Sequence, residues 1–177
     1  MIDGIDVNRN IIYLSGDISE TTVSYFISRV NYLVEQNKDR EILVYINSYG
    51  GDIYSAFGII DYMRICDVKI GTACYGAATS AAALILISAT GDAVMSKNSY
   101  LMFHPLWIKD DEEIDEKHMK DLKERVIGAI MKRPREYGDQ SQPLQTKEFW
   151  EKKLNEELYL SAQECLKMRL IHRVLSY

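Results

Sequence analysis

Cysteine is scarce in this chain of 177 residues, which contains only three. Cys66, Cys74 and Cys165 are odd in number, and no pair of them has the CxxC spacing. This pattern excludes a disulfide framework and a cysteine zinc site. The three residues are therefore predicted to be reduced thiols, and the protein to reside in a reducing compartment, the cytoplasm.

Positively charged residues are outnumbered by negatively charged ones: the chain has 21 Lys and Arg and 26 Asp and Glu, which gives a net charge of -5. Nucleic acid is not an expected partner, since binding to phosphates requires a basic surface. Asp3, Asp6 and Arg9 exclude a signal peptide at the start of the chain. Residues 68–89 form a nearly uncharged stretch of membrane-spanning length. Glycines divide it into a strand, a turn and a buried helix, so no membrane association is expected.

Length and composition are those of one globular domain, expected to comprise residues 1–177. The run at residues 42–46 is apolar throughout, as in a parallel strand covered on both faces. Ser19 is the expected N-cap of the first helix. Strands alternating with helices predict an α/β fold with right-handed crossovers, which places ligands at strand-to-helix turns. Strands are predicted at residues 11–14, 41–47, 68–74, 93–95, 101–103 and 171–175, with a helix after each of the first three, the third at 80–88.

The C-terminal part is predicted to contain one long helix after a charge-rich segment, and Pro134 should end or kink that helix. A polar loop is expected at residues 137–143. Ser161 and Glu164 have the spacing of a capping box, which predicts a short final helix. The long helix is indicated by apolar residues at helical spacing: Met119, Leu122, Val126 and Ile130.

Three segments in the first two thirds of the chain contain the parts of a serine hydrolase. They are the diglycine Gly50–Gly51, the turn that ends in Ser80, and the apolar strand that ends in His104. A serine hydroxyl is a weak nucleophile until a base takes its proton, and histidine does so near neutral pH. Backbone amides at a glycine turn can bind the oxyanion that forms. Taken singly, Ser80 is equally a small helix residue and His104 a strand-end histidine bonded to backbone.

In order and spacing these segments resemble the Clp protease proteolytic subunit family of serine peptidases, over about residues 11–175. The family has a Tyr-Ile-Asn-Ser-Pro-Gly-Gly turn, then Gly-x-Ala-Ala-Ser, then Asn-Ser-x-x-Met-Ile-His-x-Pro; the corresponding segments here are residues 45–51, 76–80 and 98–105. Tyr49 replaces the proline of the first motif, and one residue is missing between His104 and Pro105. The resemblance implies a crotonase-like α/β fold of repeated β-β-α turns with a protruding handle helix. It also implies homo-oligomeric rings, stacked heptamers, that cleave unfolded polypeptides.

The resemblance implies that Ser80 is the nucleophile and His104 the general base, with the amides of Gly51 and Ala81 as the oxyanion hole. No metal or organic cofactor is expected. An ATP-dependent unfoldase is the implied partner. The arm at residues 1–10 is shorter than the family usually carries, as in phage-encoded relatives that process capsid or scaffold proteins.

The third member of the triad departs from the family, which has an aspartate there. Counting back from Leu160-Ser161-Ala162 without a gap places Glu157 at this position, while a slip of one or two residues selects Glu156 or Asn155. Glutamate takes this role in some α/β-hydrolases.

Two other functions remain open from the sequence. The change to Glu157 leaves room for a catalytically weak or inactive structural ring subunit, although the intact Ser80–His104 pair speaks against it. A crotonase-type acyl-CoA enzyme would share the fold and the oxyanion amides, but such enzymes typically use carboxylates as acid–base groups, and the Ser80–His104 pair is less expected there.

Overall fold

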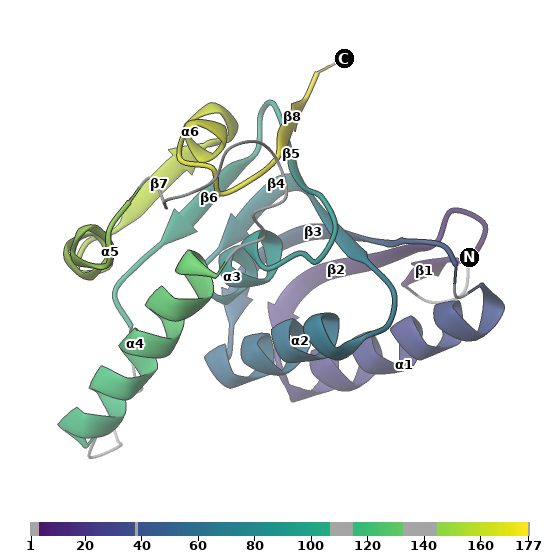
Figure 1. Cartoon of the computed structure of the whole chain (residues 1–177), viewed down its shortest axis with the longest axis horizontal. Coiled ribbons are helices and arrows are strands. Elements are labelled where there is room, and N and C mark those ends of the chain that lie inside the picture. Colours follow the sequence, from purple (N-terminus) through teal and green to yellow (C-terminus); the bar gives the residue numbers. More distant parts are fainter. Residues whose placement is uncertain (1–3, 38, 107–114, 133–144, 177) are drawn as a thin grey trace.

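The computed structural model describes residues 4–37, 39–106, 115–132 and 145–176. Over these ranges the chain forms eight strands in one sheet and six helices, which confirms the predicted α/β class (Figure 1). The strands follow the order β1-β2-β3-β4-β5-β8, and β6 pairs with both β4 and β7. Their bounds are β1 Ile5–Asp6, β2 Ile11–Ile18, β3 Ile42–Gly51, β4 Ile70–Thr79, β5 Ala93–Ser96, β6 Tyr100–Phe103, β7 Leu158–Ser161 and β8 Arg173–Leu175.

The helices begin where the sequence supplies capping side chains. Ser19 caps the first helix by accepting a hydrogen bond from the Thr22 amide, as predicted. The capping box of Ser161 and Glu164 is also confirmed, and it starts the last helix. The bounds are α1 Glu20–Gln36, α2 Ile53–Ile65, α3 Ala81–Ile87, α4 Glu116–Met131, α5 Lys147–Lys153 and α6 Ala162–Lys167.

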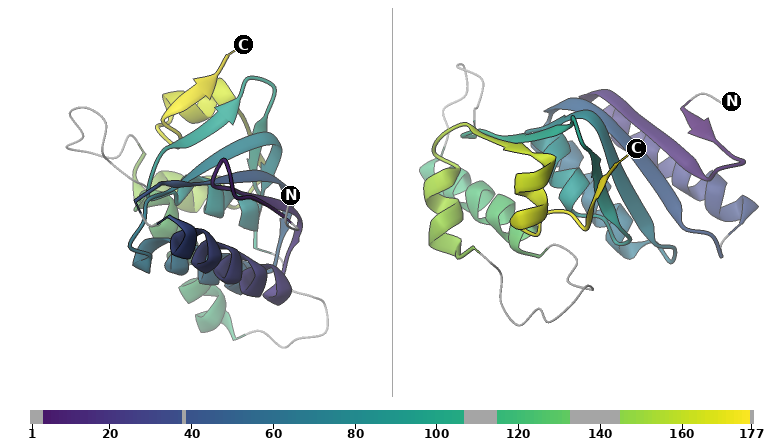
Figure 2. Two further views of the ribbon diagram at one scale, coloured as in Figure 1. Left: turned by 90° about the vertical axis from the view of Figure 1, so that its right-hand side faces the viewer. Right: turned by 90° about the horizontal axis from the view of Figure 1, so that it is seen from above.

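The central strands β2, β3 and β4 are parallel, and α1, α2 and α3 lie against one face of them (Figures 1 and 2). Ile42, Val44 and Ile46 of β3 are fully buried on that face, whereas Leu43 and Tyr45 between them are only half-buried. The prediction that this strand is covered on both faces is therefore wrong for the single chain, because its helices gather on one side.

Tyrosine rings partly cover the other face of the sheet. The Tyr45 ring lies edge-on to that of Tyr13, with centroids 5.7 Å apart, and 5.0 Å from that of Tyr75. Tyr13 and Tyr45 are direct partners on β2 and β3, and Tyr75 lies two residues beyond Ala73, the partner of Tyr45 on β4, so the rings form an oblique row across the sheet.

The helix α3 lies at the centre of the molecule, and all seven of its residues are buried. This explains the uncharged stretch in the sequence, since a buried strand and helix resemble a membrane segment in hydropathy. No helix in the described ranges is long and apolar enough to span a membrane.

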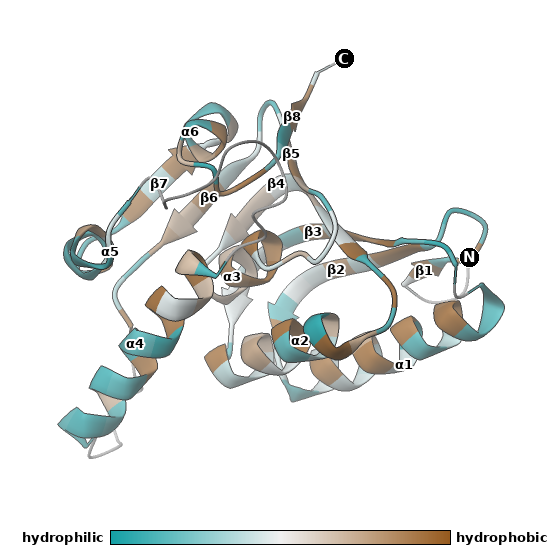
Figure 3. Ribbon diagram, viewed as in Figure 1, coloured by the Kyte–Doolittle hydropathy of each residue, from teal (hydrophilic) through white to brown (hydrophobic). Residues whose placement is uncertain are grey.

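The helix α4 projects from the body of the molecule (Figure 1), as the handle interpretation predicts. Its first turns are mainly hydrophilic (Figure 3). Burial begins at Leu122 and continues through Val126 to Ile130, where the helix packs on α3 and α5. Pro134 and the polar loop at residues 137–143 lie outside the described residues.

Several boundaries differ from the sequence predictions. The strands β2, β3 and β4 are longer than expected, and the diglycine lies at the end of β3. The elements β1, α5 and β7 were not predicted, because two to seven residues are too few for a clear periodicity. His172, expected within the last strand, precedes β8.

Candidate active site

Ser80 occupies the turn between β4 and α3, where the backbone is strained. Its φ of 53° and ψ of -123° are unusual for a residue with a side chain, and such conformations cost about 1–3 kcal/mol. The hydroxyl does not cap the helix and has no hydrogen-bond partner among the described residues. A serine on a sharp strand-to-helix turn is the arrangement of a nucleophile elbow, in which the hydroxyl is held outward for attack.

Three side chains hold the end of β4, and thereby the Ser80 turn, in place. Asn47 Oδ1 accepts a hydrogen bond of 3.2 Å from the Ala77 amide. Ser99 Oγ accepts one of 3.0 Å from the Gly76 amide. Thr79 Oγ1 donates one of 2.7 Å to the carbonyl of Tyr49, immediately before the diglycine. The strand end is therefore tied to β3 on one side and to the loop before β6 on the other.

The diglycine approaches the Ser80 turn more closely than any other residue type would allow. Gly50 has a φ of 98°, and a Cβ built on it would lie 2.7 Å from the Thr79 carbonyl oxygen and 2.8 Å from the Ser80 Cβ. Gly51, with a φ of 145°, packs equally closely against the Ile18 backbone of β2. The glycines are thus required by close backbone contact on both sides.

The two residues whose amides are expected to bind the oxyanion directly follow Gly50 and Ser80, which contact each other. Gly51 follows the glycine that touches Ser80, and Ala81 is the first residue of α3. The first amides of a helix have no intrahelical acceptor, so the Ala81 amide is available to an external oxygen.

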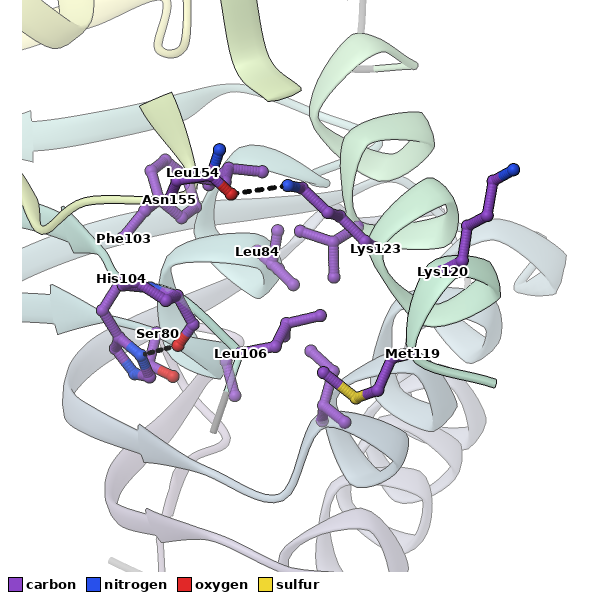
Figure 4. Close-up of a pocket in the computed structure, with 14 residues that line it drawn as sticks. Ser80, Leu84, Phe103, His104, Leu106, Met119, Lys120, Lys123, Leu154 and Asn155 are labelled. Carbon is purple, nitrogen blue, oxygen red and sulfur yellow. Dashed lines mark hydrogen bonds between the residues drawn. The ribbon is translucent and has the colours of Figure 1, made fainter. Parts of the chain in front are cut away.

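His104 is brought to Ser80 by strand pairing. It follows β6, which runs parallel to β4 with Thr79 opposite Met102, and the Ser80 amide donates a 2.8 Å hydrogen bond to the Met102 carbonyl. Ser80 and His104 are both half-buried and line one cavity of about 360 Å³ (Figure 4).

The tautomer of His104 is set by a backbone contact. Nδ1 lies 2.5 Å from the carbonyl oxygen of Pro105, which can only accept, so in the neutral ring Nδ1 carries the hydrogen and Nε2 presents its lone pair. A neutral imidazole of this form is the state that accepts a proton. Ser80 and His104 share no hydrogen bond here, and such bonds often tighten only when substrate binds.

Glu157 lies at the strand end that faces His104. The antiparallel pair of β6 and β7 ends with Phe103 opposite Leu158, so the next residues outward are His104 and Glu157. The Glu157 carboxylate is exposed and accepts a 3.3 Å hydrogen bond from the Tyr159 hydroxyl. The charge of Glu157 is the main cause of a raised pKa for Tyr159, which keeps that hydroxyl a donor. Among the described residues, no carboxylate bonds to His104.

The two alternatives to Glu157 lie nearby. Asn155 lines the cavity with Ser80 and His104, but its side-chain oxygen accepts a 2.7 Å hydrogen bond from Lys123 Nζ. Glu156 and Glu157 are both exposed, and neither lines the cavity. Asn155 therefore shares the cavity with His104, whereas Glu157 is placed opposite His104 by the strand register alone.

The remaining histidines make contacts of their own. His118 on α4 is exposed, as expected, yet its Nε2 lies 2.6 Å from the Tyr54 hydroxyl of α2. His172 Nδ1 accepts a 2.8 Å hydrogen bond from the Ala93 amide. Neither lines the cavity at Ser80. His104 is the histidine that accompanies the serine.

The buried thiols are poor competitors for the role of nucleophile. Burial raises the pKa of Cys74 to about 11 and that of Cys165 to about 12, so both stay protonated near neutral pH. Cys66 is only partly buried, and none of the three forms a disulfide. Within the described ranges, no group of three or more His, Cys, Asp or Glu side chains is placed to hold a metal ion.

One feature of the site was missed in the sequence, namely the wall that α4 contributes to the cavity. Met119 and Val126 were recognised as an apolar stripe, but nothing local indicated that they face Ser80. Lys123, between them on the same helix, also lines the cavity.

A comparison with models of protein families agrees with the geometry. The model described as Clp protease matches residues 5–177. Ser80, His104 and Glu157 all lie within the matched range, as do all eight strands.

Proposed function

The chain belongs to the Clp protease family, and from this premise we propose that it is a serine endopeptidase that hydrolyses unfolded polypeptides inside a ring-shaped compartment. One observation carries the proposal: Ser80 stands on a strained turn, its hydroxyl unbonded, in the same cavity as a histidine whose Nε2 is free to accept a proton. The continuous sheet from β1 to β8 supports a single peptidase domain.

In the proposed mechanism, the Ser80 hydroxyl oxygen attacks the carbonyl carbon of the scissile peptide bond while its proton passes to Nε2 of His104. The amides of Gly51 and Ala81 bind the oxyanion of the tetrahedral intermediate. His104 returns the proton to the leaving amine, which leaves an acyl-enzyme. Water, deprotonated by the same histidine, then hydrolyses the ester and restores Ser80. No metal or organic cofactor takes part, and ATP, where it is used, belongs to an unfoldase partner.

Assembly is part of the proposal. Members of the family typically form oligomeric rings that act on polypeptides. We infer stacked heptameric rings of identical subunits in the cytoplasm. Leu43 and Tyr45 are only half-buried on their face of the sheet in the single chain. This partly exposed apolar face supports association with further chains. The free cysteines support a reducing compartment.

The proposal is tested by labelling the purified protein with a fluorophosphonate and measuring its intact mass. One adduct per chain, together with hydrolysis of an unfolded polypeptide, is the expected result. No labelling of protein that has assembled into rings would contradict it. That outcome would favour a structural ring subunit, a second candidate suggested by the bond from His104 Nδ1 to the Pro105 carbonyl instead of to a carboxylate.

Glu157 is proposed as the third triad member, and its replacement by glutamine is expected to lower kcat/KM by about 10²–10⁴-fold. A carboxylate that replaces the Pro105 carbonyl as acceptor of the Nδ1 hydrogen bond would stabilise the imidazolium formed during attack. A glutamine amide lacks the negative charge needed for this. The measurement is kcat/KM for a fluorogenic peptide.

Glu156→Gln is the matched control, since Glu156 is an exposed glutamate next to Glu157 that the strand register does not place opposite His104. It should retain activity within about twofold, as exposed residues outside the site usually do. Equal activity of Glu157→Gln and the parent protein would reject the assignment, and a large loss in Asn155→Ala would transfer it to that residue.

A further inference from the structure

The cavity beside Ser80 is largely apolar but contains one inward-pointing positive charge. Between Ser80 and α4 it is walled by hydrocarbon side chains, and apart from Ser80 and His104 its polar lining residues are Lys120, Lys123 and Asn155. No carboxylate is among its described lining residues. The apolar lining side chains are Ile53, Ala81, Leu84, Phe103, Pro105, Leu106, Met119, Val126 and Leu154.

Lys123 and Lys120 differ in where their ammonium groups lie. In Figure 4 the Lys123 side chain reaches from α4 toward Asn155, on the side of the cavity across from Ser80, whereas the Lys120 side chain points away. Lys123 is half-buried and Lys120 is exposed. Lys123 is therefore the cation that a substrate side chain in the cavity would meet.

The charge of Lys123 is not neutralised within the described chain. Its Nζ donates to the neutral side-chain oxygen of Asn155 at 2.7 Å, and no ion pair to a described carboxylate accompanies that bond. An ammonium group has three hydrogens to donate, so capacity remains for a further acceptor. By contrast, Lys147 on α5 is paired with Glu124 at 2.7 Å and Glu151 at 3.6 Å.

We propose that Lys123 makes this cavity a specificity pocket for a side chain that ends in a carboxylate, so that the enzyme cleaves after glutamate. This inference rests on the proposed peptidase function. The methylene groups of glutamate would contact the apolar walls, and its carboxylate would accept a charge-assisted hydrogen bond from Nζ. Glutamine has the same shape without the charge, and a lysine side chain would be repelled.

The competing interpretation is structural. The aliphatic part of Lys123 covers apolar wall, and its head reaches the cavity rim simply to remain hydrated, as lysine side chains commonly do. The two interpretations differ in one measurable quantity, the preference for glutamate over glutamine. Only a functional ammonium group makes that preference depend on Lys123.

The test uses fluorogenic peptides that are identical except for Glu, Gln, Leu or Lys before the cleaved bond. The parent protein should show a kcat/KM ratio of Glu over Gln of about ten or more, since a hydrogen bond between two charged groups is stronger than one to a neutral amide. Lys123→Met should reduce the ratio to about one while keeping cleavage of the Gln and Leu peptides. Lys117→Met, on the same helix but not among the residues that line the cavity, should leave the ratio unchanged.

A ratio near one in the parent protein, or a ratio that Lys123→Met does not change, would overturn the inference while leaving the peptidase proposal intact. Failure of the peptidase proposal has a different signature, with no peptide cleaved and no fluorophosphonate adduct.

If the peptidase proposal fails, the pocket can still be tested by a binding measurement. A fluorescent product peptide ending in Glu should bind Ser80→Ala protein about tenfold more tightly than one ending in Gln. Equal affinities would reject the pocket.

Discussion

Replacing Ser80 by alanine is expected to have the largest effect of any substitution, lowering kcat/KM by at least about 10⁴-fold and eliminating the fluorophosphonate adduct. The variant keeps the fold, because the hydroxyl has no hydrogen-bond partner among the described residues. What it loses is the atom that forms the acyl-enzyme, and no neighbouring group replaces it. The buried thiol of Cys74, with a pKa raised by burial to about 11, stays protonated.

The matched control for this experiment is Ser88→Ala, at the opposite end of α3. Ser88 is buried and its hydroxyl has no hydrogen-bond partner in the part of the chain that the structure describes, so its removal should leave both stability and activity near those of the parent protein. Peptide hydrolysis and intact-mass labelling of the two variants form one comparison. Persistent labelling in Ser80→Ala protein would show that another residue is the nucleophile.

Replacing Gly50 by alanine is expected to have the second-largest effect, a loss of about 100-fold or more in kcat/KM. The added Cβ would lie 2.7 Å from the Thr79 carbonyl oxygen and 2.8 Å from the Ser80 Cβ, well inside van der Waals contact. Because both contacts are to the nucleophile turn, relief of the overlap must displace Ser80 or the oxyanion amides. The positive φ of 98° adds strain of about 1–3 kcal/mol to the folded state.

Gly16→Ala separates these two causes. Gly16 has a similar φ of 81°, but a Cβ there would meet nothing within 4 Å. Its alanine variant should lose about 1–3 kcal/mol of stability from backbone strain and keep its kcat/KM. Thermal unfolding and peptide kinetics of both variants provide the comparison. If Gly50→Ala protein were as active as Gly16→Ala protein, the close contact with Ser80 would not matter for catalysis.

Local sequence predicted many of the helices and strands of the fold. The helix that starts at Ser19, the buried helix after Ser80 and the capping box at Ser161 all follow from side-chain type and spacing, and all are present. Sequence reasoning failed at β7 and α5, which are too short to show a period. It also failed for the open face of β3, because an apolar run does not reveal on how many sides it is covered.

The sequence by itself determined the chemical groups of the site: a serine at a strand-to-helix turn, a histidine at a strand end, and a diglycine between a strand and a helix. These depend on residue type and local backbone preference. Only the tertiary structure decided their neighbours. Pairing of β6 with β7 brings Glu157 to the strand end that faces His104, and packing of α4 on α3 turns Lys123 toward the cavity. Contacts between residues far apart in the chain arise from how strands pair and helices pack. Local propensity carries no information about that register, so the position of Glu157 at the strand end opposite His104 and the place of Lys123 in the cavity wall are visible only in three dimensions.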